Sequence, residues 1–181
     1  MTRDEAYQLV VSMVSNKNLI KHMLACEACM RRLARHFGEN EEEWGLVGLL
    51  HDLDYDLTYN SPEKHTLIAA DILKEKGLSD EDIAAIKGHC EHAERNTKMA
   101  KALYAVDPIT GLIVAATLMH PEKKLAKVDK DFVLRRYKEK GFAKGANREQ
   151  IAKCADIGLS LDDFTQLCLE AMTSIADDLG L

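Results

Sequence analysis

The apolar run Leu46–Leu50 ends abruptly in His51 and Asp52. The segment 41–51 has the acidic start and apolar content of a buried helix, so this helix should stop in the core on an imidazole and a carboxylate. Two such groups buried without partners cost several kcal/mol. Because His and Asp supply the nitrogen and oxygen ligands of divalent cations, the pattern favours a bound metal ion.

The rest of the chain shows helical spacing of its apolar residues. Thr2 with Glu5 forms a capping-box pattern, Gly38 is a stop signal and Pro62 suits a first helical turn. We expect helices over 2–14, 18–37, 41–51, 61–77, 79–92 and 97–119, with two or three more near the C-terminus, after Asn147 and Ser160. The segment 52–60 is expected to be a loop, and Pro108 is expected to kink or divide the 97–119 helix.

The overall composition fits a single helical domain. The 181 residues are 46% hydrophobic and 30% charged, which is enough apolar material for a hydrophobic core, and no segment alternates like a strand. The sequence therefore predicts an all-α, compact single domain over 1–181. Its motif-bearing core spans about 18–120, and a C-terminal helical extension spans about 121–181.

Further residues of metal-ligand type lie on other predicted helices or helix ends. Metal sites in helical bundles are built from such inward side chains. His92 could replace or support His89, since residues three apart share a helix face. A shared Asp52 with five other ligands exceeds what one hydrolytic ion takes, which favours two ions. The predicted metal ligands are His22, His51, Asp52, His65, His89 and Asp107.

Each of these residues has an ordinary structural interpretation as well. A lone His22 on an apolar helix is more often a hydrogen-bonded core histidine, and Asp107 before Pro108 could be a helix-end residue. The ordered set as a whole favours the metal site. Cys26 and Cys29 have a C-x-x-C spacing, but they lie mid-helix without a second pair, so we expect buried thiols at a helix interface.

These residues resemble the motifs of the HD-domain superfamily of metal-dependent phosphohydrolases. That family's pattern is a His, then His-Asp, then a distal Asp, and His22, His51-Asp52 and Asp107 match it in order. Members with two metals carry two further histidines between these motifs, where His65 and His89 lie. The resemblance covers about residues 18–120 and implies phosphohydrolase activity.

Two motif positions depart from the family. Many two-metal members continue as His-Asp-x-Gly-Lys, where the lysine holds the substrate phosphate, but this chain has Asp54 and Tyr55 in place of the glycine and lysine. Asp54 and Asp56 are then extra carboxylates near the site, one of which could orient water or accept a proton. We expect Asp52 and Asp54 to be the catalytic carboxylates.

The charge pattern bears on the partners. A net charge of −6 argues against a nucleic-acid polymer as the partner. Residues 121–148 nevertheless carry a net charge of +6. This segment is either a solvated surface or a cover of the metal cleft that supplies phosphate-binding charge through Lys123, Lys124, Arg135 and Arg136.

Together these patterns predict a hydrolase that releases phosphate from a small phosphorylated molecule or nucleotide. The alternatives are an HD-type di-iron oxygenase and a non-catalytic metal-containing regulatory protein. Two divalent ions are expected, and the ligand types suit Fe, Mn, Zn, Co or Ni comparably. The odd number of cysteines and the lack of a signal peptide favour the cytoplasm. No stretch reaches the roughly eighteen apolar residues of a membrane span, and the oligomeric state stays open.

Overall fold

The computed structural model describes residues 1–181 and contains helices but no strands, which confirms the all-α prediction. Several helices begin where capping residues predicted, with capping boxes at Thr2 and Ser79 and side-chain caps at Asn147 and Ser160. The elements are α1 (Arg3–Met13), α2 (Lys17–Phe37), α3 (Glu41–Leu50), α4 (Tyr55–Thr58), η1 (Pro62–Lys64), α5 (Leu67–Glu75), α6 (Asp80–Gly88), α7 (Lys98–Met119), η2 (Leu125–Lys127), α8 (Lys130–Lys138), α9 (Arg148–Ala152), η3 (Lys153–Ile157), α10 (Leu161–Ser174) and α11 (Ala176–Leu179).

Several local predictions need correction, among them the expected helix 79–92, which ends at Gly88. Helix α2 begins at Lys17 and not at residue 18, because the Asn16 side chain caps it by accepting from the N–H groups of Asn18 and Leu19. The expected loop 52–60 contains the single turn α4. The expected helix 61–77 is broken at His65 and Thr66, between η1 and α5. Pro108 does not divide α7, which continues through it.

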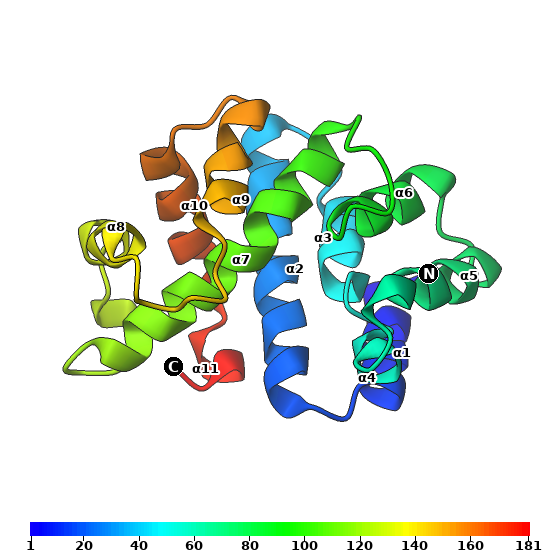
Figure 1. The fold of residues 1–181 in the computed structure, drawn as a ribbon, viewed down its shortest axis with the longest axis horizontal. Coiled ribbons are helices and arrows are strands. Elements are labelled where there is room, and N and C mark those ends of the chain that lie inside the picture. Colours follow the sequence, from blue (N-terminus) through cyan, green and yellow to red (C-terminus); the bar gives the residue numbers. More distant parts are fainter.

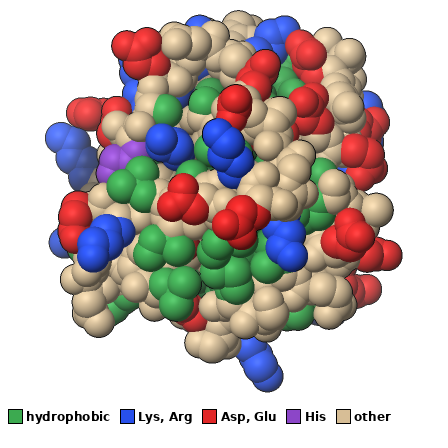
Figure 2. Space-filling model, turned by 90° about the vertical axis from the view of Figure 1, so that its right-hand side faces the viewer, with side chains coloured by type: hydrophobic (Ala, Val, Ile, Leu, Met, Phe, Trp, Pro, Cys, Tyr) green, Lys and Arg blue, Asp and Glu red, His purple; other side chains and the backbone are tan.

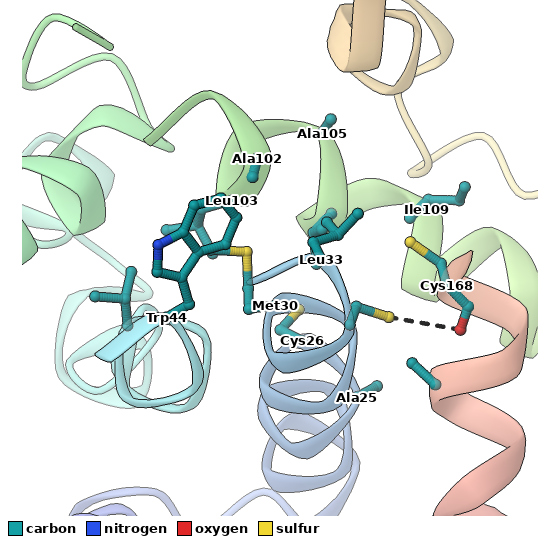
Figure 3. Close-up of a cluster of buried hydrophobic side chains, with 14 of the residues drawn as sticks. Ala25, Cys26, Met30, Leu33, Trp44, Ala102, Leu103, Ala105, Ile109 and Cys168 are labelled. Carbon is teal, nitrogen blue, oxygen red and sulfur yellow. Dashed lines mark hydrogen bonds between the residues drawn. The ribbon is translucent and has the colours of Figure 1, made fainter. Parts of the chain in front are cut away.

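Helix α7 crosses the middle of the molecule and α2 runs beside it (Figure 1). Helices α1, α3, α4, α5 and α6 lie to one side of this pair, and α8 to α11 lie to the other (Figure 1). One hydrophobic cluster of 45 buried residues includes members from α1 to α11. Figure 3 shows the part of it where Met30, Leu33, Trp44, Leu103 and Ile109 gather from α2, α3 and α7.

Helix α7 is long and apolar enough, by length and composition, to cross a membrane, although the sequence has no uninterrupted apolar stretch of that length. In this structure 61% of its most apolar stretch is buried inside the protein. It packs against α2, α6, α8, α9 and α10. These contacts are those of the core helix of a folded domain.

Helices α2 and α3 approach each other closely because α3 carries two glycines at their interface. A Cβ atom at Gly48 would lie 2.8 Å from the backbone oxygen of Cys26, and one at Gly45 would lie 2.6 Å from the Arg31 side chain. Gly48 lies one turn before His51, and Cys26 one turn after His22. The close approach therefore sets the separation of the two histidines.

The C-x-x-C cysteines are free buried thiols, as the sequence indicated. The Cys26 sulfur lies 3.8 Å from the Thr110 hydroxyl of α7. The Cys29 thiol donates to the backbone oxygen of Cys168 in α10 at 3.7 Å, the dashed contact in Figure 3. The two thiols thus face different helix interfaces and do not act as a pair.

Candidate metal centre

Three predicted ligands from three helices meet on one side of Asp52. The His22 Nε2 atom of α2 lies 3.2 Å from His51 Nε2 at the end of α3, and 3.2 Å from Asp107 Oδ1 of α7. Asp52 Oδ2 lies 3.4 Å from His51 Nε2 and 3.7 Å from His22 Nε2. We call His22, His51 and Asp107, together with Asp52 Oδ2, the first donor group.

The other two predicted histidines meet on the opposite oxygen of the same carboxylate. His65 Nε2 lies 3.2 Å from His89 Nε2. Asp52 Oδ1 lies 3.2 Å from His65 Nε2 and 3.5 Å from His89 Nε2. We call His65 and His89, together with Asp52 Oδ1, the second donor group. Asp52 is the one residue common to both groups.

Hydrogen bonds on the far side of each imidazole ring fix its orientation. Every Nδ1 atom faces an oxygen acceptor, so the network assigns the proton to Nδ1 and leaves the Nε2 lone pair aimed at the cluster. The Thr110 hydroxyl donates to the Asp107 backbone oxygen at 2.9 Å, which leaves its oxygen to accept from His22. The four acceptors are Thr110 Oγ1 for His22 (3.0 Å), the Gly48 oxygen for His51 (2.8 Å), Asp54 Oδ1 for His65 (2.9 Å) and the Ile86 oxygen for His89 (2.6 Å).

The charges in the cluster depend strongly on burial. Burial lowers the pKa of His51 to about 4, so this ring is neutral at pH 7. Burial also disfavours the charged form of His65, but hydrogen bonds to Asp52 and Asp54 outweigh it and raise the His65 pKa to about 10. Burial would raise the pKa of Asp52, whereas the surrounding imidazoles, His51 foremost, hold it well below its usual range. The Asp52 carboxylate is therefore anionic, and without a metal the protonated His65 ring supplies the positive charge beside it, which a bound ion would replace.

The cluster is enclosed except near His22 and Asp107. Their side chains are 24% and 29% exposed, whereas Asp52 is 10% exposed and His51 is fully buried. Viewed from the α5 side, histidine covers only a small area of the surface (Figure 2). A small molecule would therefore reach the cluster between α2 and α7.

Asp54 does not have the role that the sequence suggested. Its carboxylate is fully buried and accepts hydrogen bonds from the His65 ring and from the backbone N–H groups of Thr66 and Ala69. A carboxylate occupied in this way is not a free proton acceptor, which corrects the expected catalytic role. Asp54 instead positions His65. The Asp56 carboxylate points elsewhere and accepts from the Ser15 backbone and hydroxyl.

His92 supports the second donor group from behind. Because α6 ends at Gly88, His92 does not share a helix face with His89. Its Nδ1 atom lies 2.8 Å from the His65 backbone oxygen and 3.3 Å from the Thr66 hydroxyl. The geometry thus favours His89 over His92 as the ligand.

Two threonines that sequence reasoning missed hold the cluster in place. Thr110 follows Asp107 by three residues on α7, and this spacing was the available signal for its contact with His22. Thr66 has a φ of 68°, the left-handed region that costs a β-branched residue about 1–2 kcal/mol. Nothing in the sequence marks Thr66, since its conformation follows from the hydrogen bonds to Asp54.

The basic segment 121–148 lies away from the cluster, contrary to the hypothesis that it covers the cleft. Helix α8 packs against α7 and α10, on the other side of α7 from α3, α5 and α6 (Figure 1). Arg135 and Arg136 lie over the Phe132 ring. Lys123 and Lys124 follow the end of α7, about 18 Å along that helix from Asp107.

The donor sets fit divalent ions. Separations of 3.2 to 4.0 Å within the first donor group and 3.2 to 3.5 Å within the second are close to the roughly 3.0–3.4 Å between ligands held about 2.1 Å from one ion. With the imidazoles neutral, as metal binding requires, the Nε2 lone pairs and the carboxylate charge converge within each group. Imidazole with carboxylate suits Zn, Fe, Mn, Co or Ni.

Comparison with known proteins agrees with this geometry. The HD domain family matches residues 19–128, which is more than half of the chain and a range that contains all six predicted ligands. Ribonuclease Y of Nitratidesulfovibrio vulgaris strain Hildenborough is 31% identical over 96 residues, which are 53% of this chain and 18% of the relative. Ribonuclease Y of Fervidobacterium nodosum is 29% identical over 136 residues, 74% of this chain and 26% of the relative. The chain thus spans only about a quarter or less of these relatives.

Proposed function

The chain belongs to the HD-domain superfamily of metal-dependent phosphohydrolases, and on that basis we propose that it releases phosphate from a small phosphorylated molecule with two divalent ions. The first donor group would hold one ion and the second donor group the other, with Asp52 shared. Ions bound there supply a water whose pKa is lowered to about 7 and positive charge against the phosphoryl oxygens. A nucleophilic serine or cysteine is not required.

The observation that supports two ions most directly is the placement of the Asp52 oxygens. Oδ2 faces His22 and His51, whereas Oδ1 faces His65 and His89. One carboxylate divided between two sets of nitrogen donors is the arrangement expected of a bridging ligand.

The protein's own groups orient the reactants. The Nδ1 hydrogen bonds hold four imidazoles in one orientation, so little rearrangement is needed on binding. Enclosure by α3, α5 and α6 limits water to the open side at His22 and Asp107. Tyr55, which replaces the family's phosphate-binding lysine, places its ring against that of His65 with centroids 5.5 Å apart. It supports the second donor group but brings no positive charge.

The proposed substrate is a small phosphate ester. The relatives named Ribonuclease Y raise RNA as a further substrate class, but the matched region is a minor part of them. The net charge of −6 and the distance of the basic segment from the cluster favour a small molecule.

The test is metal analysis of the purified protein combined with phosphate release from phosphomonoesters, nucleotides, cyclic dinucleotides and a short RNA. Asp52→Ala should lose both ions and lower kcat/KM by about a hundredfold or more. Asp56→Ala is the matched control, because Asp56 is a nearby carboxylate that contacts Ser15 and no cluster residue. Circular dichroism of both variants verifies their folding.

The remaining outcomes decide between functions. Redox-active iron without phosphate release would favour an oxygenase over the proposed hydrolase. Bound metal without turnover of any substrate would favour a regulatory protein. Cleavage of RNA in preference to every small ester would contradict the proposed substrate class.

A further inference from the structure

Residues 89–97 join α6 to α7, and we call this segment the strap. In Figure 1 the strap is the green connection between α6 and the first turn of α7. It begins with His89, a member of the second donor group, which follows the last helical residue Gly88. The last carbonyl groups of a helix have no partner inside the helix. The position of His89 therefore depends on what closes this end of α6.

The Arg95 side chain closes the end of α6. Its Nη1 atom donates to the Gly88 backbone oxygen at 2.8 Å, whereas the backbone N–H of Glu91 lies 3.4 Å from the same oxygen. The Arg95 side chain also lies directly against Gly88, since a Cβ atom built there would be 3.1 Å from Arg95 Cγ. The His89 ring donates to the Ile86 oxygen in this same last turn of α6. Arg95 thus holds the turn that carries both His89 and its acceptor.

Two partners hold the Arg95 guanidinium in turn. Its central carbon lies 3.8 Å from the centroid of the Tyr104 ring, a close cation–π contact. Its Nη1 atom lies 3.2 Å from Glu91 Oε2, and the Tyr104 hydroxyl donates to Glu91 Oε1 at 2.9 Å. We call Glu91, Arg95 and Tyr104 the arginine clamp. Each of the three contacts the other two.

The clamp connects the surroundings of the two donor groups. Tyr104 precedes Asp107 by three residues on α7, so the two residues share a helix face. Asp107 belongs to the first donor group, whereas Arg95 holds the turn before His89 of the second. The clamp therefore ties the end of α6 to the stretch of α7 that carries Asp107.

The backbone of the strap is strained at the clamp. Glu91 has a φ of 70°, in the left-handed region that is unfavourable for residues other than glycine. Such a conformation persists only where surrounding contacts compensate for it. The contacts of the Glu91 carboxylate with Arg95 and Tyr104 are contacts of this kind.

We propose that Arg95 is a positioning residue for the second ion, because it holds the last turn of α6 and fixes His89 relative to Asp107. The inference rests on the proposed function for the presence of the ions. For the placement of His89 it rests on the contacts of the clamp. His22 and Asp107 lie inside long helices, so the first ion should depend on Arg95 far less than the second.

The first experiment measures the affinity of both sites for Zn²⁺ by competition with a chelator of known affinity. Variants His22→Gln and His65→Gln, which each remove a ligand of one group, assign the two affinities. Arg95→Met should weaken the second ion about tenfold and leave the first nearly unchanged. Arg95→Lys should weaken it similarly, since an ammonium group lacks the planar guanidinium that spans Gly88, Glu91 and the Tyr104 ring.

Variants of Tyr104 test the other side of the clamp. Tyr104→Phe keeps the ring beneath the guanidinium and loses only the hydroxyl contact with Glu91, so it should weaken the second ion less than Tyr104→Leu does. A purely electrostatic role of Arg95 would instead leave Arg95→Lys like the wild type and make the two Tyr104 variants equal. That pattern overturns the positioning role.

Arg32→Met is the matched control. The Arg32 side chain is 29% exposed, close to the 26% of Arg95, and it pairs with Glu170 of α10 at 3.0 Å, away from the cluster. This variant should change neither affinity. Melting temperatures in EDTA verify that each variant folds.

A second measurement needs no metal. In the metal-free protein the buried His89 ring donates from Nδ1 to the Ile86 oxygen at 2.6 Å, so its Nδ1 proton should exchange slowly in NMR of the imidazole groups. His89→Gln assigns the signal. Arg95→Met should broaden or abolish it, whereas Arg32→Met should preserve it.

The outcomes separate the positioning role from the proposed function. Zn²⁺ affinities that fall equally or stay unchanged in Arg95→Met, or a His89 signal that persists in that variant, overturn the positioning role. Two bound ions without hydrolysis of any ester overturn the hydrolase, and selective loss of the second ion in Arg95→Met then still supports the clamp. If the wild-type protein binds no Zn²⁺, the proposed function fails and the His89 signal alone decides, its loss in Arg95→Met supporting the clamp.

Discussion

His22 and Asp107 of the first donor group lie inside long helices, whereas His51 and both histidines of the second donor group lie where helices stop. His22 and Asp107 belong to α2 and α7, the two helices that cross the hydrophobic core. His51 follows α3, His65 follows η1 and His89 follows α6. Helix packing therefore fixes His22 and Asp107, whereas the second donor group is held by the hydrogen bonds that its rings donate to Asp54 and the Ile86 oxygen, and by His92 at the His65 backbone oxygen.

The proposed metal centre thus depends on two kinds of stabilisation, helix packing and hydrogen bonds at helix ends. Helix packing is disturbed by changes of volume at the interface. Hydrogen-bonded helix ends are disturbed by loss of a single partner. Substitutions at packed positions and at hydrogen-bonded positions should therefore have different effects.

The largest expected effect is a pH dependence of stability with opposite sign for His51 and His65, measured by urea unfolding in EDTA. The His51 pKa of about 4 lies below its unfolded value near 6.5, so its contribution is present above pH 6.5 and is lost as the pH falls toward 4, by about 3 kcal/mol. The His65 pKa of about 10 lies above the unfolded value, so its contribution is present below pH 6.5 and is lost as the pH rises through 10.

Two glutamine variants test which histidine causes each loss of stability. His51→Gln should reduce the loss at acid pH, and His65→Gln should reduce the loss at alkaline pH. If the loss of stability at acid pH is unchanged in His51→Gln, another group causes that loss.

Gly48→Ala should lower the free energy of unfolding by about 1–3 kcal/mol, because its Cβ would meet the backbone of α2 at Cys26. The same change should weaken the first ion more than the second, since it separates His22 from His51. Gly111→Ala is the matched control in α7, where the added Cβ meets nothing. It should stabilise the protein by about 0.5–1 kcal/mol. Equal effects of the two substitutions in urea unfolding would contradict close α2–α3 packing.

Asp54→Ala should weaken the second ion tenfold to a hundredfold and leave the first nearly unchanged, because His65 loses the partner of its Nδ1 atom. Competition with a chelator of known affinity measures both sites. Asp56→Ala should change neither. Equal loss of both ions in Asp54→Ala would mean that Asp54 acts through the whole fold and not through His65.

The smallest expected effect is at Thr66. Thr66→Gly and Thr66→Ala both remove the hydroxyl, but only glycine adopts a φ of 68° without strain. Thr66→Gly should therefore be more stable than Thr66→Ala by about 1 kcal/mol in urea unfolding. If the two variants are equally stable, residue 66 leaves the left-handed region at the start of α5 when alanine replaces threonine.

Much of the fold could be predicted because its signals are local. Caps at Thr2, Ser79 and Ser160 and the stop at Gly38 each act within one helical turn. The break at His65 and Thr66 could not be predicted in this way, because Pro62 and the following apolar residues favour a continuous helix. It is stabilised by Asp54, a partner whose bonds to Thr66 and Ala69 form only in the folded protein.

The helical class and the residue types of the cluster follow from the sequence, since apolar periodicity and the order of His and Asp residues need no tertiary information. The tertiary structure alone shows that Asp54 holds His65, that Thr110 holds His22, and that the basic segment lies beyond α7. These outcomes depend on which helix faces meet. Packing between distant segments decides that, and local propensity does not.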